Sequence, residues 1–293
     1  FIDQFSSLSV PNRVSISPCG KGMPNVLLKS EDRLKNYNVG TTEIFNINAN
    51  NGTSLYCRLI KPSNFDPEKK YPVVVYVYNG PHVQLISNSY LGGSSLWMNY
   101  LAEQGYLVFT VDGQGSAHRG KEFEQIIHRQ LGTQEMADQL AGVEWLKKQS
   151  YVNPARMAVH GWSFGGFMTT SLMLRAPGTF KVGVAGGPVI DWRLYEVMYT
   201  ERYMDTPKNN PEGFKNSDLT QFAQNLKGRL LMIHGTEDPV VVWQHSLLFT
   251  KACVDKSRLL DYYVYPGHEH NVMGKDRANL YEKITDYIFT HIK

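Results

Sequence analysis

The stretch ARMAVHGWSFGGFMTTSLMLR (residues 155–175) decides the fold of this 293-residue chain. A short apolar strand comes first, then a glycine-rich turn, then a helix that begins near Phe164. The turn contains GWSFG (161–165), a GxSxG pentapeptide centred on Ser163. A sharp strand-to-helix turn lifts such a serine hydroxyl clear of the sheet, and the new helix N-terminus favours developing negative charge. Its place between strand and helix indicates a nucleophile elbow rather than a chance pentapeptide in a loop.

Buried strands and amphipathic helices alternate on both sides of this stretch. Strands are expected at 71–78, 106–112, 155–161, 181–187, 229–235 and 261–266. Helices are expected at 96–105, 133–149, 164–176, 192–203, 243–254 and 279–292. Such alternation indicates βαβ units. The sequence therefore predicts an α/β fold with a mostly parallel central sheet flanked by helices.

The N-terminal part has a different rhythm. Residues 1–36 read as a few short strands with polar turns, and two longer strands follow at 41–49 and 54–62. The Asn-Asn-Gly between these two suits a tight hairpin turn, because both residue types tolerate positive φ. The chain opens on Phe1 without a signal peptide, so we expect a piece of a longer protein whose targeting signal lies elsewhere.

Composition excludes several classes of function. The net charge is only +3 and no Lys/Arg stripe exists, which argues against a nucleic-acid partner. No apolar run approaches the roughly 20 residues of a membrane span. Cys19, Cys57 and Cys253 are too few for a disulfide framework, and we expect three buried or half-buried thiols.

A serine nucleophile needs a base, and in this fold class the order is Ser, then Asp or Glu, then His. Glu237 or Asp238 follows one late strand, and His268 or His270 follows the next. Spacing alone does not choose within either pair.

Other histidines and a metal site are the alternatives to this assignment. His160 and His234 also lie at strand ends, where we expect hydrogen-bonded structural side chains. The HxH pair of His268 and His270 is compatible with a metal, but zinc needs further ligands. No partner motif is present, so we expect neither a metal nor a cofactor.

Seven motifs together resemble the prolyl oligopeptidase family, its dipeptidyl peptidase IV branch and, within it, the bacterial prolyl tripeptidyl peptidases. They are YVYNGP (76–81), DGQGSAHRG (112–120), RQLGTQEM (129–136), GWSFGGF (161–167), GGPVIDWRLYEVMYTERY (186–203), HGTEDPV (234–240) and YPGHEHNVMG (265–274). The resemblance runs from about Val39 to the C-terminus. It implies an α/β-hydrolase catalytic domain at 39–293, preceded at 1–38 by the end of a β-propeller and a linker.

The resemblance also resolves the ambiguous pairs. It places the catalytic acid on Asp238 and the catalytic base on His270. It implies an oxyanion hole made of the Phe164 backbone N–H and the Tyr78 hydroxyl.

A pocket for the residue before the cleaved bond is implied in the same way. The matching positions are Val189, Trp192, Tyr195, Tyr199 and Val241. The three aromatic residues are spaced i, i+3, i+7, so they are expected on one helix face. A flat aromatic surface suits a pyrrolidine ring, which makes no demand for an N–H acceptor.

Two further positions bear on how many residues are released. Glu196 lies one helical turn after Trp192 and is expected to bind the free α-amine of the substrate; the alternatives are a solvated glutamate or a partner for Arg193. Val240 stands where dipeptidyl members carry an asparagine that contacts the substrate, which favours tripeptide release.

The predicted function is a serine exopeptidase that releases N-terminal di- or tripeptides after proline through an acyl-enzyme, with tripeptides favoured. Its substrates are peptides with proline in the second or third position. Alternatives are dipeptidyl peptidase IV-like release, or an acylaminoacyl peptidase or esterase on the same fold. The presence of Ser163, Asp238 and His270 argues against a non-catalytic interaction module.

The family resemblance implies three further properties. Without the propeller, we expect weak peptidase activity and surviving hydrolysis of small activated esters. A homodimer is expected, and bacterial relatives suggest the periplasm or cell envelope.

Overall fold

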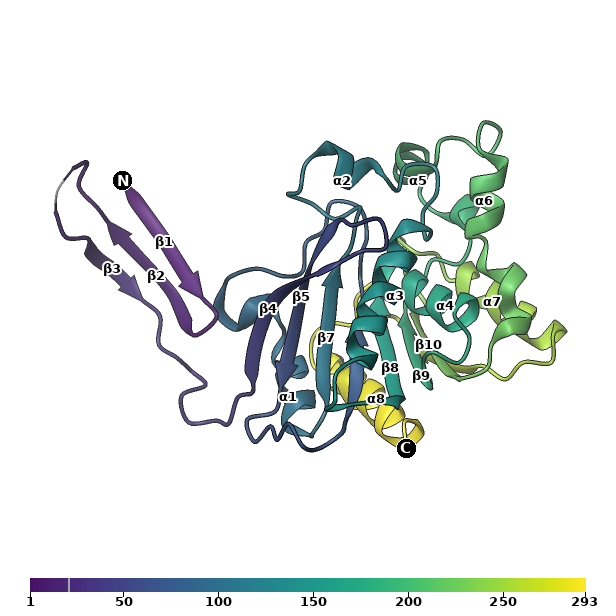
Figure 1. Ribbon diagram of the computed structural model, residues 1–293. Helices are drawn as coiled ribbons and strands as arrows, with labels where there is room; N and C mark the ends of the chain where they lie inside the picture. Colours follow the sequence, from purple (N-terminus) through teal and green to yellow (C-terminus); the bar gives the residue numbers. More distant parts are fainter. Residues whose placement is uncertain (21) are drawn as a thin grey trace.

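An eight-stranded sheet forms the centre of the computed structural model, which describes residues 1–20 and 22–293 (Figure 1). The strand order is β11-β10-β9-β8-β6-β7-β5-β4. The strands are β4 (Thr41–Asn48), β5 (Ser54–Lys61), β6 (Tyr71–Tyr76), β7 (Leu107–Asp112), β8 (Val152–Trp162), β9 (Val182–Gly186), β10 (Arg229–Gly235) and β11 (Asp261–Tyr265). Strands β4, β5 and β7 pair antiparallel, and all other neighbours run parallel. The expected α/β fold with a mostly parallel sheet is confirmed.

Helices cover both faces of this sheet, and a separate apolar cluster lies under each layer (Figure 1). The longer helices are α1 (Leu96–Glu103), α3 (Gln134–Lys147), α4 (Phe164–Arg175), α5 (Val197–Met204), α7 (Gln244–Asp255) and α8 (Asp276–His291). The shorter ones are α2 (Lys121–Gln125), α6 (Pro211–Ser217) and the 3-10 helices η1 (Tyr90–Gly93), η2 (Trp192–Leu194) and η3 (Leu219–Asn225). Helices α1 and α8 pack on one face, and α3, α4 and α7 pack on the other. Burial on both faces explains why the central strands are continuous apolar runs.

The β4–β5 hairpin forms as the sequence indicates. Its turn contains the Asn-Asn-Gly sequence, and Gly52 adopts a φ of 83°. Strand β6 ends at Tyr76, two residues earlier than expected. Its last expected residues, including Tyr78, therefore lie in the loop beyond the carboxyl end of the strand.

The single helix expected at 192–203 is wrong. The chain forms the 3-10 helix η2, then two non-helical residues, then α5. The Asp191 side chain accepts from the Arg193 N–H at 2.9 Å and caps the 3-10 turn. The Glu196 carboxylate accepts from the Met198 and Tyr199 N–H groups, both at 2.8 Å, and starts a new helix there. Two capping carboxylates within five residues divide what periodicity alone presents as one helix.

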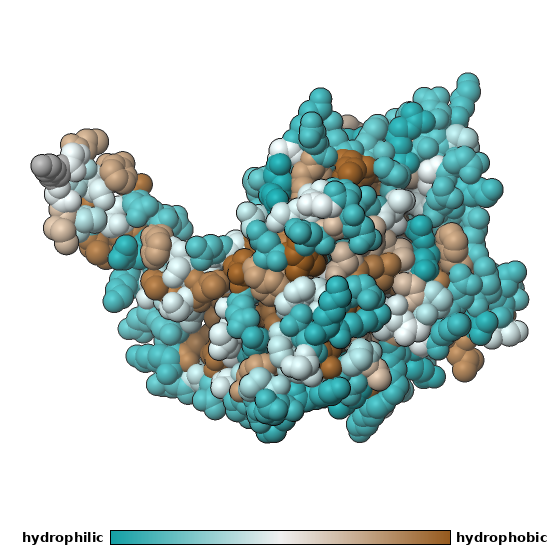
Figure 2. Space-filling model, in the orientation of Figure 1, coloured by the Kyte–Doolittle hydropathy of each residue, from teal (hydrophilic) through white to brown (hydrophobic). Residues whose placement is uncertain are grey.

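The three N-terminal strands form a sheet of their own, which stands away from the body (Figures 1 and 2). They are β1 (Ile2–Ser7), β2 (Val10–Ile16) and β3 (Asn25–Lys29), paired antiparallel. The sheet contacts the body at η1, where the Tyr90 N–H donates to Ser6 Oγ at 2.8 Å and the Leu91 N–H donates to the Leu8 carbonyl at 3.2 Å. Several apolar side chains of β3 are exposed, including Val26, Leu27 and Leu28.

Two of the three cysteines follow the expectation. Cys57 and Cys253 are buried free thiols, and burial raises the pKa of Cys253 to about 11. Cys19 is exposed, so the expectation is wrong for it: it lies in the connection between β2 and β3, in the N-terminal sheet that stands away from the body. Over residues 1–20 and 22–293, no helix combines the length and apolarity that crossing a bilayer requires.

Candidate active site

Ser163 lies at the sharp turn between the end of β8 and the start of α4. Its backbone has φ 62° and ψ −118°, a conformation that non-glycine residues rarely adopt. The Ser163 N–H donates to the Gly186 carbonyl at 2.8 Å, and the Ser163 carbonyl accepts from Phe167 at 3.0 Å. These bonds hold a strained residue in place, which is typical of a functional turn.

The glycines around Ser163 are required by close backbone approach. A Cβ on Gly161 would lie 2.2 Å from the Val77 carbonyl oxygen, and one on Gly165 would lie 2.3 Å from the same atom. A Cβ on Gly166 would lie 2.5 Å from the Gly186 carbonyl oxygen. The carbonyl groups of the loop after β6 and of the end of β9 therefore leave no room for a side chain at these three positions.

An acid–base pair forms in the loops after β10 and β11. His270 Nδ1 lies 2.7 Å from Asp238 Oδ2, while the other oxygen of Asp238 accepts from the Val240 and Val241 N–H groups at 2.9 and 2.8 Å. His268 instead contacts Asp276 at 3.0 Å. Glu237, the alternative acid, is exposed. Of the two acids and two histidines that spacing left open, Asp238 and His270 are therefore the ones in contact.

His234 is a second imidazole on the same carboxylate. Its Nε2 lies 3.2 Å from Asp238 Oδ2 and 2.7 Å from the Val241 carbonyl, and its Nδ1 lies 2.6 Å from Ser246 Oγ. Burial pushes the pKa of Asp238 up, but the hydrogen bonds from His234 and His270 outweigh burial and hold it well below its usual range. Asp238 is therefore ionised, as the orienting partner of a general base must be.

The loop that carries His270 is fixed to the elbow itself. Trp162, the residue before the serine, donates from Nε1 to the His270 carbonyl at 2.8 Å. Ser163 and His270 line the same pocket, which Tyr78 also lines. The structure thus brings the serine, the histidine and the tyrosine to one opening, although they lie far apart in sequence.

Tyr78 lines this opening, and Phe164 directly follows Ser163 in the chain. Tyr78 is half-buried in the loop after β6, and its ring lies 6.2 Å from the ring of Phe164. Burial raises the pKa of Tyr78, so its hydroxyl stays protonated and can donate. Phe164 is the first residue of α4, where a backbone N–H has no acceptor within the helix.

The aromatic residues expected in the pocket form one cluster even though they do not share a helix. Trp192 stacks on Tyr199 with ring centroids 5.9 Å apart, and meets Tyr195 edge-on at 5.3 Å. Val189, Val241 and Trp192 are buried, whereas Tyr195 and Tyr199 are partly exposed. The two tyrosines therefore provide the accessible surface of the cluster.

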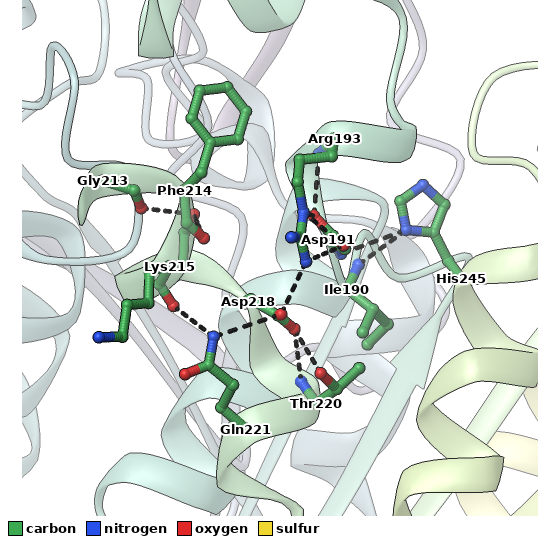
Figure 3. Close-up of polar contacts among 11 residues, drawn as sticks. Ile190, Asp191, Arg193, Gly213, Phe214, Lys215, Asp218, Thr220, Gln221 and His245 are labelled. Atoms are coloured by element: carbon green, nitrogen blue, oxygen red, sulfur yellow. Dashed lines mark hydrogen bonds and ion pairs between the residues drawn. The ribbon is translucent and has the colours of Figure 1, made fainter. Parts of the chain in front are cut away.

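A polar network surrounds the residues on either side of Trp192, among them Ile190, Asp191 and Arg193 (Figure 3). The Arg193 guanidinium donates to Asp191 at 2.6 Å and to Asp218 at 2.9 Å. His245, buried on α7, accepts at Nδ1 from the Ile190 N–H at 3.1 Å. These bonds tie this segment to both η3 and α7, so the cluster rests on a rigid support.

Glu196 has a structural task that its sequence position did not indicate. Its two carboxylate oxygens cap α5, while the side chain remains exposed. Arg193 pairs with Asp191 and Asp218, so the alternative that pairs it with Glu196 is wrong. Glu196 is not one helical turn from Trp192, because the helix is broken between them.

The sequence interpretation missed part of the site. His234 is a buried, hydrogen-bonded histidine as expected, but its additional contact with Asp238 was not foreseen. The available signal was its place four residues before Asp238 in HGTED. The sequence interpretation also missed Arg58 and Arg277, which line the pocket at Ser163 from β5 and α8. Within the described ranges, no three His, Cys, Asp or Glu side chains gather in a way that would hold a metal ion.

Comparisons with known proteins show which family and which solved structures this chain resembles. A model of the prolyl oligopeptidase family matches residues 94–293. The chain is 34% identical over 244 residues to mouse dipeptidyl peptidase 8, covering 82% of this chain and 27% of that protein. A Bacteroides ovatus structure assigned as a dipeptidyl aminopeptidase IV superposes with a TM-score of 0.97 at 50% identity, over 99% of this chain and 41% of that one. Porphyromonas gingivalis dipeptidyl peptidase 4 gives a TM-score of 0.92 at 36% identity, over 99% and 42%.

Proposed function

We propose that this chain, which belongs to the prolyl oligopeptidase family, is the catalytic domain of a serine peptidase. The proposed peptidase removes N-terminal dipeptides after proline. The observation that carries this proposal is the 2.7 Å contact between His270 Nδ1 and Asp238 Oδ2 beside the Ser163 elbow. The chain spans 27% of the mouse relative named above. The activity of the whole protein is therefore part of the proposal.

The three residues act in acyl transfer as follows. His270 takes the proton from Ser163 Oγ as the oxygen attacks the peptide carbonyl, and then gives it to the leaving amine. Asp238 keeps the proton on His270 Nδ1, so that Nε2 is free to accept, and stabilises the imidazolium that forms. A water molecule then hydrolyses the acyl-enzyme by the same route.

The negative oxygen of the tetrahedral intermediate is stabilised by the Phe164 N–H and the Tyr78 hydroxyl. Tyr78 lines the same pocket as Ser163, and Phe164 directly follows Ser163 in the chain. The Tyr78 hydroxyl stays protonated because burial raises its pKa. Donors placed in advance at a developing charge are often the largest single catalytic effect.

Proline specificity is assigned to the aromatic cluster. Tyr195 and Tyr199 present partly exposed rings over the buried Trp192, and flat apolar faces suit a pyrrolidine ring. The polar network beside Trp192 keeps these faces in place.

Dipeptide release is proposed first because the mouse relative and the Porphyromonas structure are both dipeptidyl peptidases. Tripeptide release is the second candidate, and Val240 favours it. This side chain is 41% exposed, two residues after Asp238, and offers no amide to a substrate carbonyl. Glu196 is proposed to bind the substrate amine in addition to capping α5, because each carboxylate oxygen accepts more than one hydrogen bond.

Residues 1–38 are proposed to be the end of a preceding β-propeller. They contain a separate three-stranded sheet, and the Bacteroides structure extends well beyond the matched part. We infer that such a domain completes the binding of the substrate amine. This chain on its own is then expected to cleave peptides weakly while still hydrolysing small activated esters.

The test uses the full natural protein and three anilides with free amines: Gly-Pro, Ala-Ala-Pro and Gly-Leu. Dipeptide release predicts turnover of Gly-Pro-anilide, little turnover of Gly-Leu-anilide, and none in Ser163→Ala. Preference for Ala-Ala-Pro-anilide identifies the tripeptidyl candidate instead. Equal turnover of the proline and leucine substrates would refute proline specificity, and no turnover of any anilide would refute the exopeptidase.

A further inference from the structure

A pocket of about 470 Å³ extends from Ser163 and His270 between α1 and the start of α8. Its apolar wall contains Trp97, Leu280 and Ile284. No residue of the aromatic cluster around Trp192 lines it. It is therefore a second compartment at the nucleophile, of the size that small-molecule ligands occupy.

The charge of this compartment is one-sided. Two arginines, Arg58 and Arg277, line the pocket. Among the residues that the structure describes, no Asp or Glu lines it. Arg277 is exposed and donates to Tyr281 Oη at 3.2 Å; within residues 1–20 and 22–293 it forms no ion pair. Its guanidinium keeps donors for an added anion, because it carries five N–H groups.

Arg58 is the buried arginine of this pocket, with 1% of its surface exposed. It donates to the Gly92 carbonyl at 2.8 Å and to Thr110 Oγ1 at 3.1 Å, while its buried Nε has no acceptor in the described structure. Burial lowers the pKa of Arg58 to about 10, and the nearby charge of Asp112 opposes this effect. The Asp112 carboxylate itself accepts from the Leu85 and Ile86 N–H groups. Within the described residues no carboxylate forms an ion pair with Arg58, so its buried charge is incompletely compensated and an anion in the pocket would be attracted to it.

The position of the pocket indicates which part of a substrate binds in it. His270 must deliver its proton to the leaving amine, so the residue after the cleaved bond lies beside His270. From there the pocket continues along Asn271, Val272 and Met273. A ligand that enters from the cleaved bond thus meets an apolar wall and a positive charge.

We propose that this pocket binds the leaving side of the substrate when it ends in a free carboxylate close to the cleaved bond, with Arg277 as the direct contact and Arg58 as a buried source of positive field. The inference rests on the proposed peptidase function. It makes the enzyme selective for short peptides, with one or two mostly apolar residues after the cleavage site. Arg277 and Arg58 are then specificity residues for the length of the substrate.

The turnover test compares Gly-Pro-Leu with Gly-Pro-Leu-amide, using the full natural protein. The acid is expected to have a kcat/KM about tenfold above the amide, since a charge-assisted hydrogen bond is the difference. In Arg277→Gln this ratio falls towards one, whereas Arg277→Lys keeps part of it. Lys283→Gln is the matched control, because it removes a positive charge from the same helix at a residue that does not line the pocket. High salt is expected to reduce the ratio.

A binding measurement separates this inference from the peptidase function. Calorimetry with Ser163→Ala measures the affinity for Leu-Phe and for Leu-Phe-amide, which lack the proline part. The acid is expected to bind about tenfold more tightly, and Arg277→Gln in that background removes the difference. Equal affinity, or no binding of either, overturns the inference. Turnover of Gly-Pro-anilide without an acid preference refutes the pocket alone, whereas acid-selective binding without any turnover refutes the peptidase alone.

Discussion

His234 Nε2 lies 3.2 Å from Asp238 Oδ2, the same oxygen that contacts His270 at 2.7 Å. The Val241 carbonyl at 2.7 Å requires a proton on this Nε2, so His234 donates there and shares its N–H with the carboxylate. Its Nδ1 lies 2.6 Å from Ser246 Oγ. Asp238 thus contacts a fully buried imidazole in addition to His270.

Replacing His234 should lower kcat more than it changes KM. His234→Phe removes a donor to Asp238, and a hydrogen bond to a charged group contributes about 1.5–3 kcal/mol, or roughly 10–100-fold. His234→Gln places an amide N–H near the former Nε2 and should recover most of the rate. Steady-state kinetics on Gly-Pro-anilide across pH check this, because the loss of the donor raises the pKa of Asp238. Equal losses in the Phe and Gln variants, with an unchanged pH profile, would indicate a purely structural role.

Tyr78→Phe should reduce kcat by about 10²–10³ while KM changes little, because it deletes one oxyanion donor that acts in the transition state. The ring and its packing on Phe164 remain, so the unfolding temperature should stay close to that of the wild type. Kinetics and a thermal melt on the same preparation test this. A large rise in KM with unchanged kcat would place the hydroxyl in ground-state binding instead.

Gly161→Ala should destabilise the fold by about 1–3 kcal/mol, as overpacking of a dense interior does, since the new Cβ would lie 2.2 Å from the Val77 carbonyl oxygen. Gly178→Ala is the matched control. Its Cβ would meet nothing within 4 Å, so only its φ of 89° opposes the change, at about 1–2 kcal/mol. Urea unfolding measures both. A Gly161 variant with the stability of the wild type would contradict the close approach at the elbow.

Stability should fall as the pH is lowered from about 6.5 towards 4. Burial lowers the pKa of His160 to about 4, against the opposing effect of its hydrogen bond to the Val184 carbonyl. Between these pH values the unfolded chain binds a proton that the folded chain does not, so the free energy of unfolding decreases by at most about 1.4 kcal/mol per pH unit for this group.

His160→Asn is the matched variant for this pH dependence. It keeps an N–H for Val184 but does not titrate, and should flatten the slope. His245, whose pKa burial also lowers to about 4, accounts for a further part of the slope. Urea unfolding at several pH values tests both statements. A slope that His160→Asn leaves unchanged would show that His160 is protonated in the fold.

The sequence predicts the elbow and the sheet because local chemistry determines both. Gly161 and Gly165 are the only residue type that the close carbonyl permits, and the central strands are apolar because both faces are covered. The broken helix after Asp191 was not predictable from periodicity. Side-chain caps outweigh the weak preference of a short amphipathic stretch, and the aromatic spacing looked helical even though the rings meet across a break.

Contacts between elements far apart in the sequence were the second feature of the site that the sequence did not predict. The residue pattern left two acids and two bases open, and the family resemblance, not spacing, selected Asp238 and His270. The contact of His234 with Asp238 depends on how the loop after β10 turns back, which spacing does not reveal. Arg58 and Arg277 lie on β5 and α8, at opposite ends of the sequence, and only the fold brings them to one pocket.

The most direct test of the central claim, that Ser163 is a nucleophile activated by His270 and Asp238, is labelling with a fluorophosphonate followed by peptide mass spectrometry. We expect a single phosphonylated serine at Ser163, with labelling slowed by about 10⁴ in Asp238→Asn, the loss expected when the imidazole takes the wrong tautomer. An unlabelled Ser163, or one that Asp238→Asn labels at the wild-type rate, would contradict it.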